Sequence, residues 1–313
     1  MNRDGHSLVL GNLHIMFYRT CRVPRAQGLV NALPAGVGHF PLFRVADFPN
    51  APEHWTQDGY FIPMYPQEAM WIGFAVRGGP VALLVSAGMV NAVSGMRFEP
   101  VLSQDPQNYL AVPPQPWLDG FKRTQGESVY QFVAAELGSG ETAEEQILGS
   151  AEFGGLQFSL YTPKVEIKSI ERPREHVLYA VATSEAVRTR GGVLSRDMGL
   201  GAGGAISQKI YPDPYLEGRG VREVWGDQAD FHAVMHIVHS MDFEAITGSV
   251  PPATPITYEF YQQNGYPWFA LPDGRWGDVE GNEIFDTIKP VSGGPTEVIP
   301  STPKPVVVPA ENK

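Results

Sequence analysis

The sequence has little cysteine and little charge. Of its 313 residues only Cys21 is a cysteine, and charged side chains make up 18%. A single cysteine excludes an internal disulfide and is typical of a reducing compartment. Basic side chains are especially scarce, with 23 Lys and Arg against 34 Asp and Glu. The chain therefore lacks the basic face that nucleic acids and anionic lipids require, and we expect neither as a partner.

Long hydrophobic runs are also absent. The longest run, residues 81–93, is interrupted by Ser86, Gly88 and Asn91, whereas a helix that spans a membrane needs about 20 consecutive apolar residues. The first residues have no apolar stretch behind a basic start, as a signal peptide would. We expect a soluble, cytoplasmic protein with no membrane insertion.

Familiar catalytic motifs form the third absence: there is no GxSxG nucleophile elbow, no GKS or GKT phosphate loop and no HExxH zinc motif. Residues 199–204 do match the GxGxxG dinucleotide fingerprint, which requires a strand before it and a helix after it. Polar residues precede this stretch, and residues 206–211 alternate like a strand. We therefore expect no cofactor and a tight loop in which Gly199, Gly201 and Gly204 let backbones approach closely, with ligand binding there as the alternative.

Glycine and proline are abundant, with 34 and 28 residues, and they separate short hydrophobic runs. The runs at 70–76 and 81–85 flank the turn sequence Arg77-Gly78-Gly79-Pro80 and predict a β-hairpin. Trp71, inside the first of these runs, is expected in the core. Together the runs predict a β-rich α+β fold, with mostly antiparallel strands in one or two sheets and a few short helices.

The helix signals are few and local. Thr142 with Glu145 three residues later is a capping-box pattern, and Gly149 stands where a C-terminal glycine cap would, so a short helix is predicted between them. Further short helices are predicted at 242–247, before Gly248, and within 254–263.

The chain is predicted to contain a globular region, residues 1–289, and a proline-rich disordered tail, residues 290–313. The tail has too few hydrophobic residues to offset the entropy lost on ordering. Its Pro300-Ser301-Thr302-Pro303 matches PxxP, so docking on an aromatic groove is an alternative to a plain tail. Residues 163–190 are the least patterned interior stretch, either a surface connection or the join between two halves, with a further strand predicted at 177–182.

The densest group of histidines is His232, His236 and His239. On a helix, His232 and His236 would share one face and could ligate a metal. The β-branched residues around them favour a strand instead, on which these two side chains are about 13 Å apart and cannot share one ion. Metal binding stays open as the alternative to satisfied or surface histidines.

Two tryptophans, Trp117 and Trp268, lie beside proline and glycine. If exposed, they would stack on sugar rings or on a partner; if buried, they are core residues whose N–H groups bond nearby. The candidate ligand-binding set is therefore Trp117, Trp268, Gly199, Gly201, Gly204 and His236.

Several segments resemble a family of uncharacterised bacterial proteins that is common in actinobacteria and often labelled "integral membrane protein". The resemblance covers most of residues 15–275 and excludes the tail. It implies no activity and assigns no catalytic residue, and its membrane label disagrees with the run lengths above. The segments that carry it are 59–65 (GYFIPMY), 68–71 (EAMW), 90–95 (VNAVSG), 115–120 (QPWLDG), 138–149, 198–204 through 214–215, and 265–269 (GYPWF).

Together these observations predict a non-enzymatic binding or structural protein that interacts with a protein partner or with itself. The alternative is a hydrolase-type or metal-dependent enzyme centred on His236. No catalytic residue is assigned.

Overall fold

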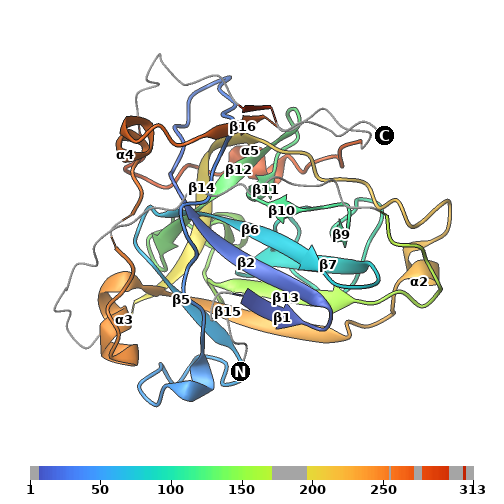
Figure 1. Ribbon diagram of the computed structural model, residues 1–313, viewed down its shortest axis with the longest axis horizontal. Helices are drawn as coiled ribbons and strands as arrows, with labels where there is room; N and C mark the ends of the chain where they lie inside the picture. Colours follow the sequence, from blue (N-terminus) through green and yellow to red (C-terminus); the bar gives the residue numbers. More distant parts are fainter. Residues whose placement is uncertain (1–6, 171–195, 254, 271–276, 296–305, 308–313) are drawn as a thin grey trace.

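The computed structural model describes residues 7–170, 196–253, 255–270, 277–295 and 306–307 (Figure 1). This part of the chain is rich in antiparallel strands and has only short helices, which confirms the predicted β-rich α+β class. None of its helices has the length and apolar character needed to span a membrane.

Among these residues fourteen strands form one large sheet, and three form a small one. The strands of the large sheet are β1 (Ser7–Leu10), β2 (Leu13–Thr20), β4 (Phe43–Arg44), β5 (Tyr60–Met64), β6 (Ala69–Val76), β7 (Val81–Ala87), β8 (Val90–Asn91), β9 (Leu110–Val112), β10 (Trp117–Leu118), β11 (Gly120–Lys122), β12 (Ser128–Glu136), β13 (Leu156–Tyr161), β14 (Asp197–Ser207) and β15 (Phe231–His239). Its main order is β1-β2-β6-β12-β14-β15-β13-β7-β8. The small sheet has the order β17-β16-β3, with β3 (Leu33–Pro34), β16 (Trp268–Ala270) and β17 (Val306–Val307).

The predicted hairpin at 70–85 is wrong in its pairing, although both strands exist. β6 pairs with β2, β10 and β12, whereas β7 pairs with β8, β9 and β13. The segment 110–122 accounts for the difference, because its β9 lies on β7, its β10 on β6 and its β11 on β12. β6 and β7 therefore each pair with a strand of segment 110–122 instead of with each other.

Residues 163–190 do not separate two sheets. The strand order β12-β14-β15-β13 places two strands from beyond this stretch between two strands from before it. Residues 171–195, including the strand predicted at 177–182, lie outside the described residues.

The large sheet curls around one hydrophobic core. Side chains from β1, β2, β5, β6, β7, β12, β13, β14 and β15 share this core, and the glycine turn after β1 lies against β15, where a Cβ on Gly11 would be 2.7 Å from the Phe231 ring. Smaller clusters cover the outer faces of the strands, among them one around Trp71 and Trp117 and one around Trp225. Trp71 is buried and stacked on Tyr18, as predicted for a core residue.

The helices are short, and α2, α3 and α4 lie at the periphery of the strands (Figure 1). They are α1 (Ala143–Leu148), α2 (Val221–Val224), α3 (Ser240–Thr247), α4 (Tyr258–Gln263) and α5 (Ile284–Thr287), with a 3-10 turn, η1, at Val45–Asp47. The capping box predicted at Thr142 is confirmed, and Gly149 has the left-handed conformation of a C-terminal cap. Gly248 ends α3 in the same way.

The packed part of the chain extends beyond residue 289, where the sequence predicted a tail to begin. The Val291 N–H donates to the Ala202 carbonyl at 3.0 Å, and the Arg22 guanidinium donates to the carbonyls of Val291 and Ser292. Farther along the tail, Val306–Val307 form β17. Residues 296–305 and 308–313 of the predicted tail lie outside the described part.

Candidate functional site

The glycine-rich stretch at 199–204 is a strand, not the predicted loop. It forms the middle of β14 and pairs with β12 over most of its length. A Cβ on Gly201 would stand 2.3 Å from the Glu141 carbonyl oxygen, and one on Gly204 the same distance from the Pro24 carbonyl oxygen, while one on Gly199 would meet the Thr142 side chain. The prediction that backbones approach closely at these glycines was correct. The glycines allow other segments of the chain to cross over β14 at short distance.

The histidine segment is a strand, β15, as its β-branched residues predicted. His236 is buried; its ring stacks on that of Trp55 and contacts that of Phe153, with centroids 4.9 and 5.0 Å away. Burial lowers the pKa of His236 to about 4, against the raising effect of Asp197. The neutral ring accepts a hydrogen bond at Nε2 from the Thr56 N–H at 3.0 Å. Among the described residues no three His, Cys, Asp or Glu side chains are arranged to hold a metal ion.

An ionic group that sequence reasoning missed lies where β12 ends, β14 begins and β15 ends. We call it the His54 cluster: His54, Asp197, Arg196, Glu136 and His239. His54 Nε2 is 2.5 Å from an Asp197 carboxylate oxygen, and the other oxygen accepts from Trp55 Nε1 at 2.9 Å. The His54 side chain is 65% exposed. The members of the His54 cluster come from distant parts of the chain, so no motif or residue spacing in the sequence predicts it.

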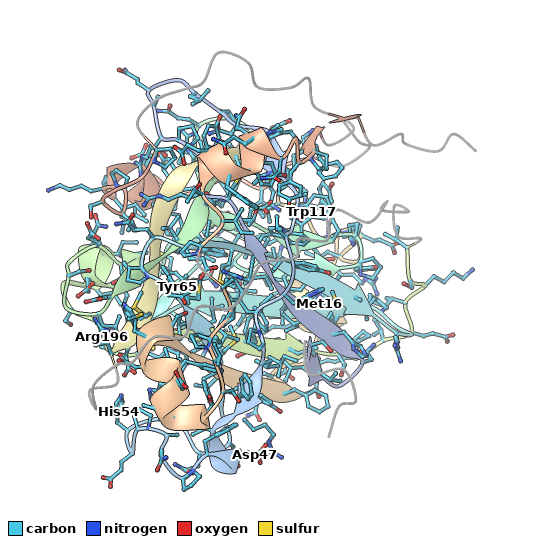
Figure 2. The ribbon with its side chains drawn as sticks, turned by 60° about the vertical axis from the view of Figure 1, so that its left-hand side comes forward. Met16, Asp47, His54, Tyr65, Trp117 and Arg196 are labelled. Carbon is cyan, nitrogen blue, oxygen red and sulfur yellow. The ribbon has the colours of Figure 1, made fainter. Side chains whose placement is uncertain are left out.

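Arg196 of the His54 cluster is paired with two carboxylates. It lies 3.1 Å from that of Asp242, outside the cluster, and 3.5 Å from that of Glu136. His239 is also 3.5 Å from Glu136, and burial together with the Arg196 charge lowers its pKa. Figure 2 shows His54 and Arg196 on one side of the molecule and Trp117 well away from both.

Trp117 is a core residue, 4% exposed, so it presents no face to a sugar or partner. Its Nε1 donates to Asp119 Oδ2 at 2.8 Å. Burial raises the pKa of Asp119 to about 8, against the lowering effect of the Trp117 bond. The second oxygen, Oδ1, has no hydrogen-bond partner among the described residues, which favours a neutral, protonated carboxyl group at neutral pH.

Buried glutamines hold the outer segments to one another, a role that no motif indicated. The Gln115 amide donates to the carbonyls of Trp117 and Lys209 and accepts from the Tyr211 N–H. Gln107 and Gln208 bridge the same two segments, 107–119 and 208–213, in the same manner. Each side-chain amide thus supplies hydrogen bonds to backbone groups that have no neighbouring strand to bond to.

Glu144, in the first turn of α1, is buried. Its carboxylate accepts from four backbone N–H groups at 2.8–3.1 Å, those of Met89, Glu152, Phe153 and Gly154. The carboxylate therefore ties α1 to two turns of the chain.

Trp268, the second candidate tryptophan, is likewise buried, at 2% exposure, and lies in β16. Tyr261 holds this strand in place, with its ring packed on Trp268. Its hydroxyl donates to the Pro267 carbonyl at 2.5 Å and accepts from the Ala35 N–H at 2.6 Å. On the edge away from β3, β16 pairs in parallel with β17, with Phe269 opposite Val306 and Ala270 opposite Val307.

The structure does not bring the predicted site residues together. Trp117 and Trp268 share one outer core cluster, His236 lies beside the His54 cluster, and the glycines are covered by crossing segments. A depression of about 330 Å³, lined by Ser94, Pro106 and residues 280–283, contains none of them. Comparisons with known protein families, with curated proteins and with solved structures find no match.

Proposed function

We propose that this chain is a non-enzymatic binding protein that holds an extended peptide strand along the edge of β16. The observation that carries the proposal is the parallel pairing of β17 with β16, in which a segment remote in sequence is bound as a peptide would be. Addition of a strand to an exposed sheet edge is a general mode of peptide recognition, with affinity supplied by main-chain hydrogen bonds.

The groups that would carry chemistry support this proposal because they are bonded to the protein's own backbone. His236 Nε2 accepts a backbone N–H, Glu144 accepts four, and the amides of Gln107, Gln115 and Gln208 bridge backbone groups. These side chains maintain the fold, and β16 offers an edge that is already held in place by Tyr261.

The test uses the full-length chain with Val306→Pro and Val307→Pro, which removes both N–H groups of β17 and frees the β16 edge. A fluorescent peptide of residues 302–313 is expected to bind this variant with a dissociation constant of about 0.1 mM, a value ordinary for a short strand, measured by fluorescence anisotropy. The wild-type chain is expected to bind the peptide at least about tenfold more weakly, because its own β17 competes at high effective concentration.

The matched control is the same peptide with proline in place of Val306 and Val307. It keeps the length and charge of the first peptide and lacks the two backbone donors of β17. Equal binding of the two peptides, or no binding of either to the variant chain, contradicts the proposal.

One observation favours a second candidate, an acid–base site at His54. An exposed imidazole held by a carboxylate, as His54 is by Asp197 at 2.5 Å, is the arrangement that orients a general base. In hydrolysis of an ester such as p-nitrophenyl acetate, the ring would take a proton from the attacking water as the phenolate leaves. His54→Gln is then expected to lower the rate about 100-fold, with His14→Gln as the control; equal rates in all three proteins rule this site out.

A further inference from the structure

We infer that the partner held at the β16 edge is a second copy of this chain, which inserts its own Val306–Val307 strand there. The inference rests on the proposed function and names its ligand. In this arrangement each copy gives its β17 to the other and receives one in return, so both edges are occupied and the assembly closes as a two-fold dimer.

The receiving strand does not depend on the tail for its position. β16 is held on its other edge by β3, through Trp268 opposite Pro34 and Phe269 opposite Leu33. Tyr261 adds hydrogen bonds to Pro267 and Ala35, and Trp268 and Phe269 are buried beside it. An empty β16 edge is therefore ready to accept a strand from any source.

Within the described residues, β17 pairs with β16 through two residue pairs, whereas β12 and β14 share eight. This short pairing contributes few hydrogen bonds, so we expect β17 to leave β16 more readily than a strand of the large sheet leaves its neighbour. Ten residues, 296–305, join β17 to Pro295, and a connection of that length spans up to about 35 Å. The covalent link thus permits β17 to reach either its own β16 or that of a neighbour, with the same contacts in both places.

The balance between the two arrangements depends on concentration and salt. A short linker gives a tethered strand an effective concentration on the order of millimolar, so exchange requires a concentrated protein. Two copies with a net charge of −11 each repel one another, and salt screens that repulsion. Dimer formation is therefore expected to rise with protein concentration and between 50 and 500 mM NaCl.

The decisive experiment mixes two variants of the chain, Ala270→Cys and Val307→Cys. The β16–β17 register pairs these two positions, and in the mixture the two cysteines are paired only when β17 of one copy lies on β16 of the other. Aligned residues of neighbouring strands are within disulfide range, and the native Cys21 is buried. Mild oxidation of the mixture at about 1 mM is expected to give a disulfide-linked heterodimer, at least about tenfold more than a control mixture of Val307→Cys with Ser150→Cys on the exposed turn after α1.

A heterodimer yield equal to that of the control overturns the inference, and so does a double variant, Ala270→Cys with Val307→Cys, that at 1 mM forms only disulfides within one chain. The peptide-binding test separates this failure from that of the proposed function. If the freed β16 edge binds the peptide and no heterodimer forms, exchange between copies is wrong while strand binding stands. If the peptide also fails to bind, both are wrong.

Discussion

The large sheet and the small sheet of this protein are held by different means. In the large sheet, long ladders such as β12–β14 are reinforced by buried side chains that bond to backbone groups, Glu144 and Gln115 among them. In the small sheet, β17 adds two residue pairs to a strand that is already fixed. The difference separates a framework that is costly to disturb from an attachment that can be released without loss of the fold.

The largest effect is expected from Glu144→Ala, which leaves four N–H groups, one buried and three partly buried, without their acceptor. We expect a loss of about 4 kcal/mol in the free energy of unfolding, because a buried donor without a partner costs about 1–3 kcal/mol and a charged acceptor is lost as well. Chemical denaturation measures it. The neighbouring Glu145→Gln keeps a capping-box residue and is expected to cost less than about 1 kcal/mol; equal losses would show that the Glu144 bonds do not stabilise the framework.

Next in size is the pH dependence caused by Asp119. Its pKa of about 8 in the folded protein lies far above the value near 3.9 of an unfolded chain. Between these values the folded state holds a proton that the unfolded state has lost, so stability is fully present below pH 4 and falls as the pH rises to about 8. Asp119→Asn removes this dependence, and we expect it to gain on the order of 3 kcal/mol relative to wild type between pH 5 and pH 9.

Urea denaturation at several pH values measures this gain, with the exposed Asp58→Asn as the control. Parallel stability curves for wild type and Asp119→Asn would show that the Asp119 carboxyl is not held neutral in the fold.

A smaller effect is expected from Gln115→Ala. Its amide makes three bonds to backbone groups in a buried place, and its loss should cost about 2 kcal/mol. Gln146 makes a comparable set of backbone bonds near the surface, where water can replace the amide. Thermal unfolding should therefore show a clearly smaller loss for Gln146→Ala; similar losses would mean that burial of Gln115 adds nothing.

The smallest effect is expected from Val306→Pro with Val307→Pro in the small sheet, less than about 1 kcal/mol in the free energy of unfolding. Hydrogen exchange should then increase at β16 and remain unchanged in β12 and β14. Increased exchange in the large sheet would show that the two sheets are not independent.

Local patterns in the sequence predicted local structure well. The capping box at Thr142, the cap at Gly248 and the strand through His232 and His236 depend on neighbours within a few residues, and each was predicted correctly. Features that depend on distant residues were missed. The glycines in β14 lie where other segments cross the strand. The hairpin predicted at 70–85 does not form because strands of segment 110–122 pair with β6 and β7.

The candidate site was the least predictable part. Trp117 and Trp268 have the same local setting whether they are exposed or buried, and only the packing of the outer cluster decides between these outcomes. The His54–Asp197 contact joins residues 143 positions apart, and the β16–β17 pairing joins a core strand to a segment whose proline content indicated disorder.

The packing of residues 290–292 against β14 has a consequence for biosynthesis. Ala202 in β14 contacts Pro290 and Val291, and Arg22, which follows β2, donates to the same late segment. Residues 290–292 are made after β14, so on the ribosome the Ala202 carbonyl lacks its hydrogen bond from the Val291 N–H until the later segment has emerged. Because ribosomes add about 5–20 residues per second and pairings between distant segments form slowly, the sheet should reach its final form only after residues 290–292 have left the ribosome.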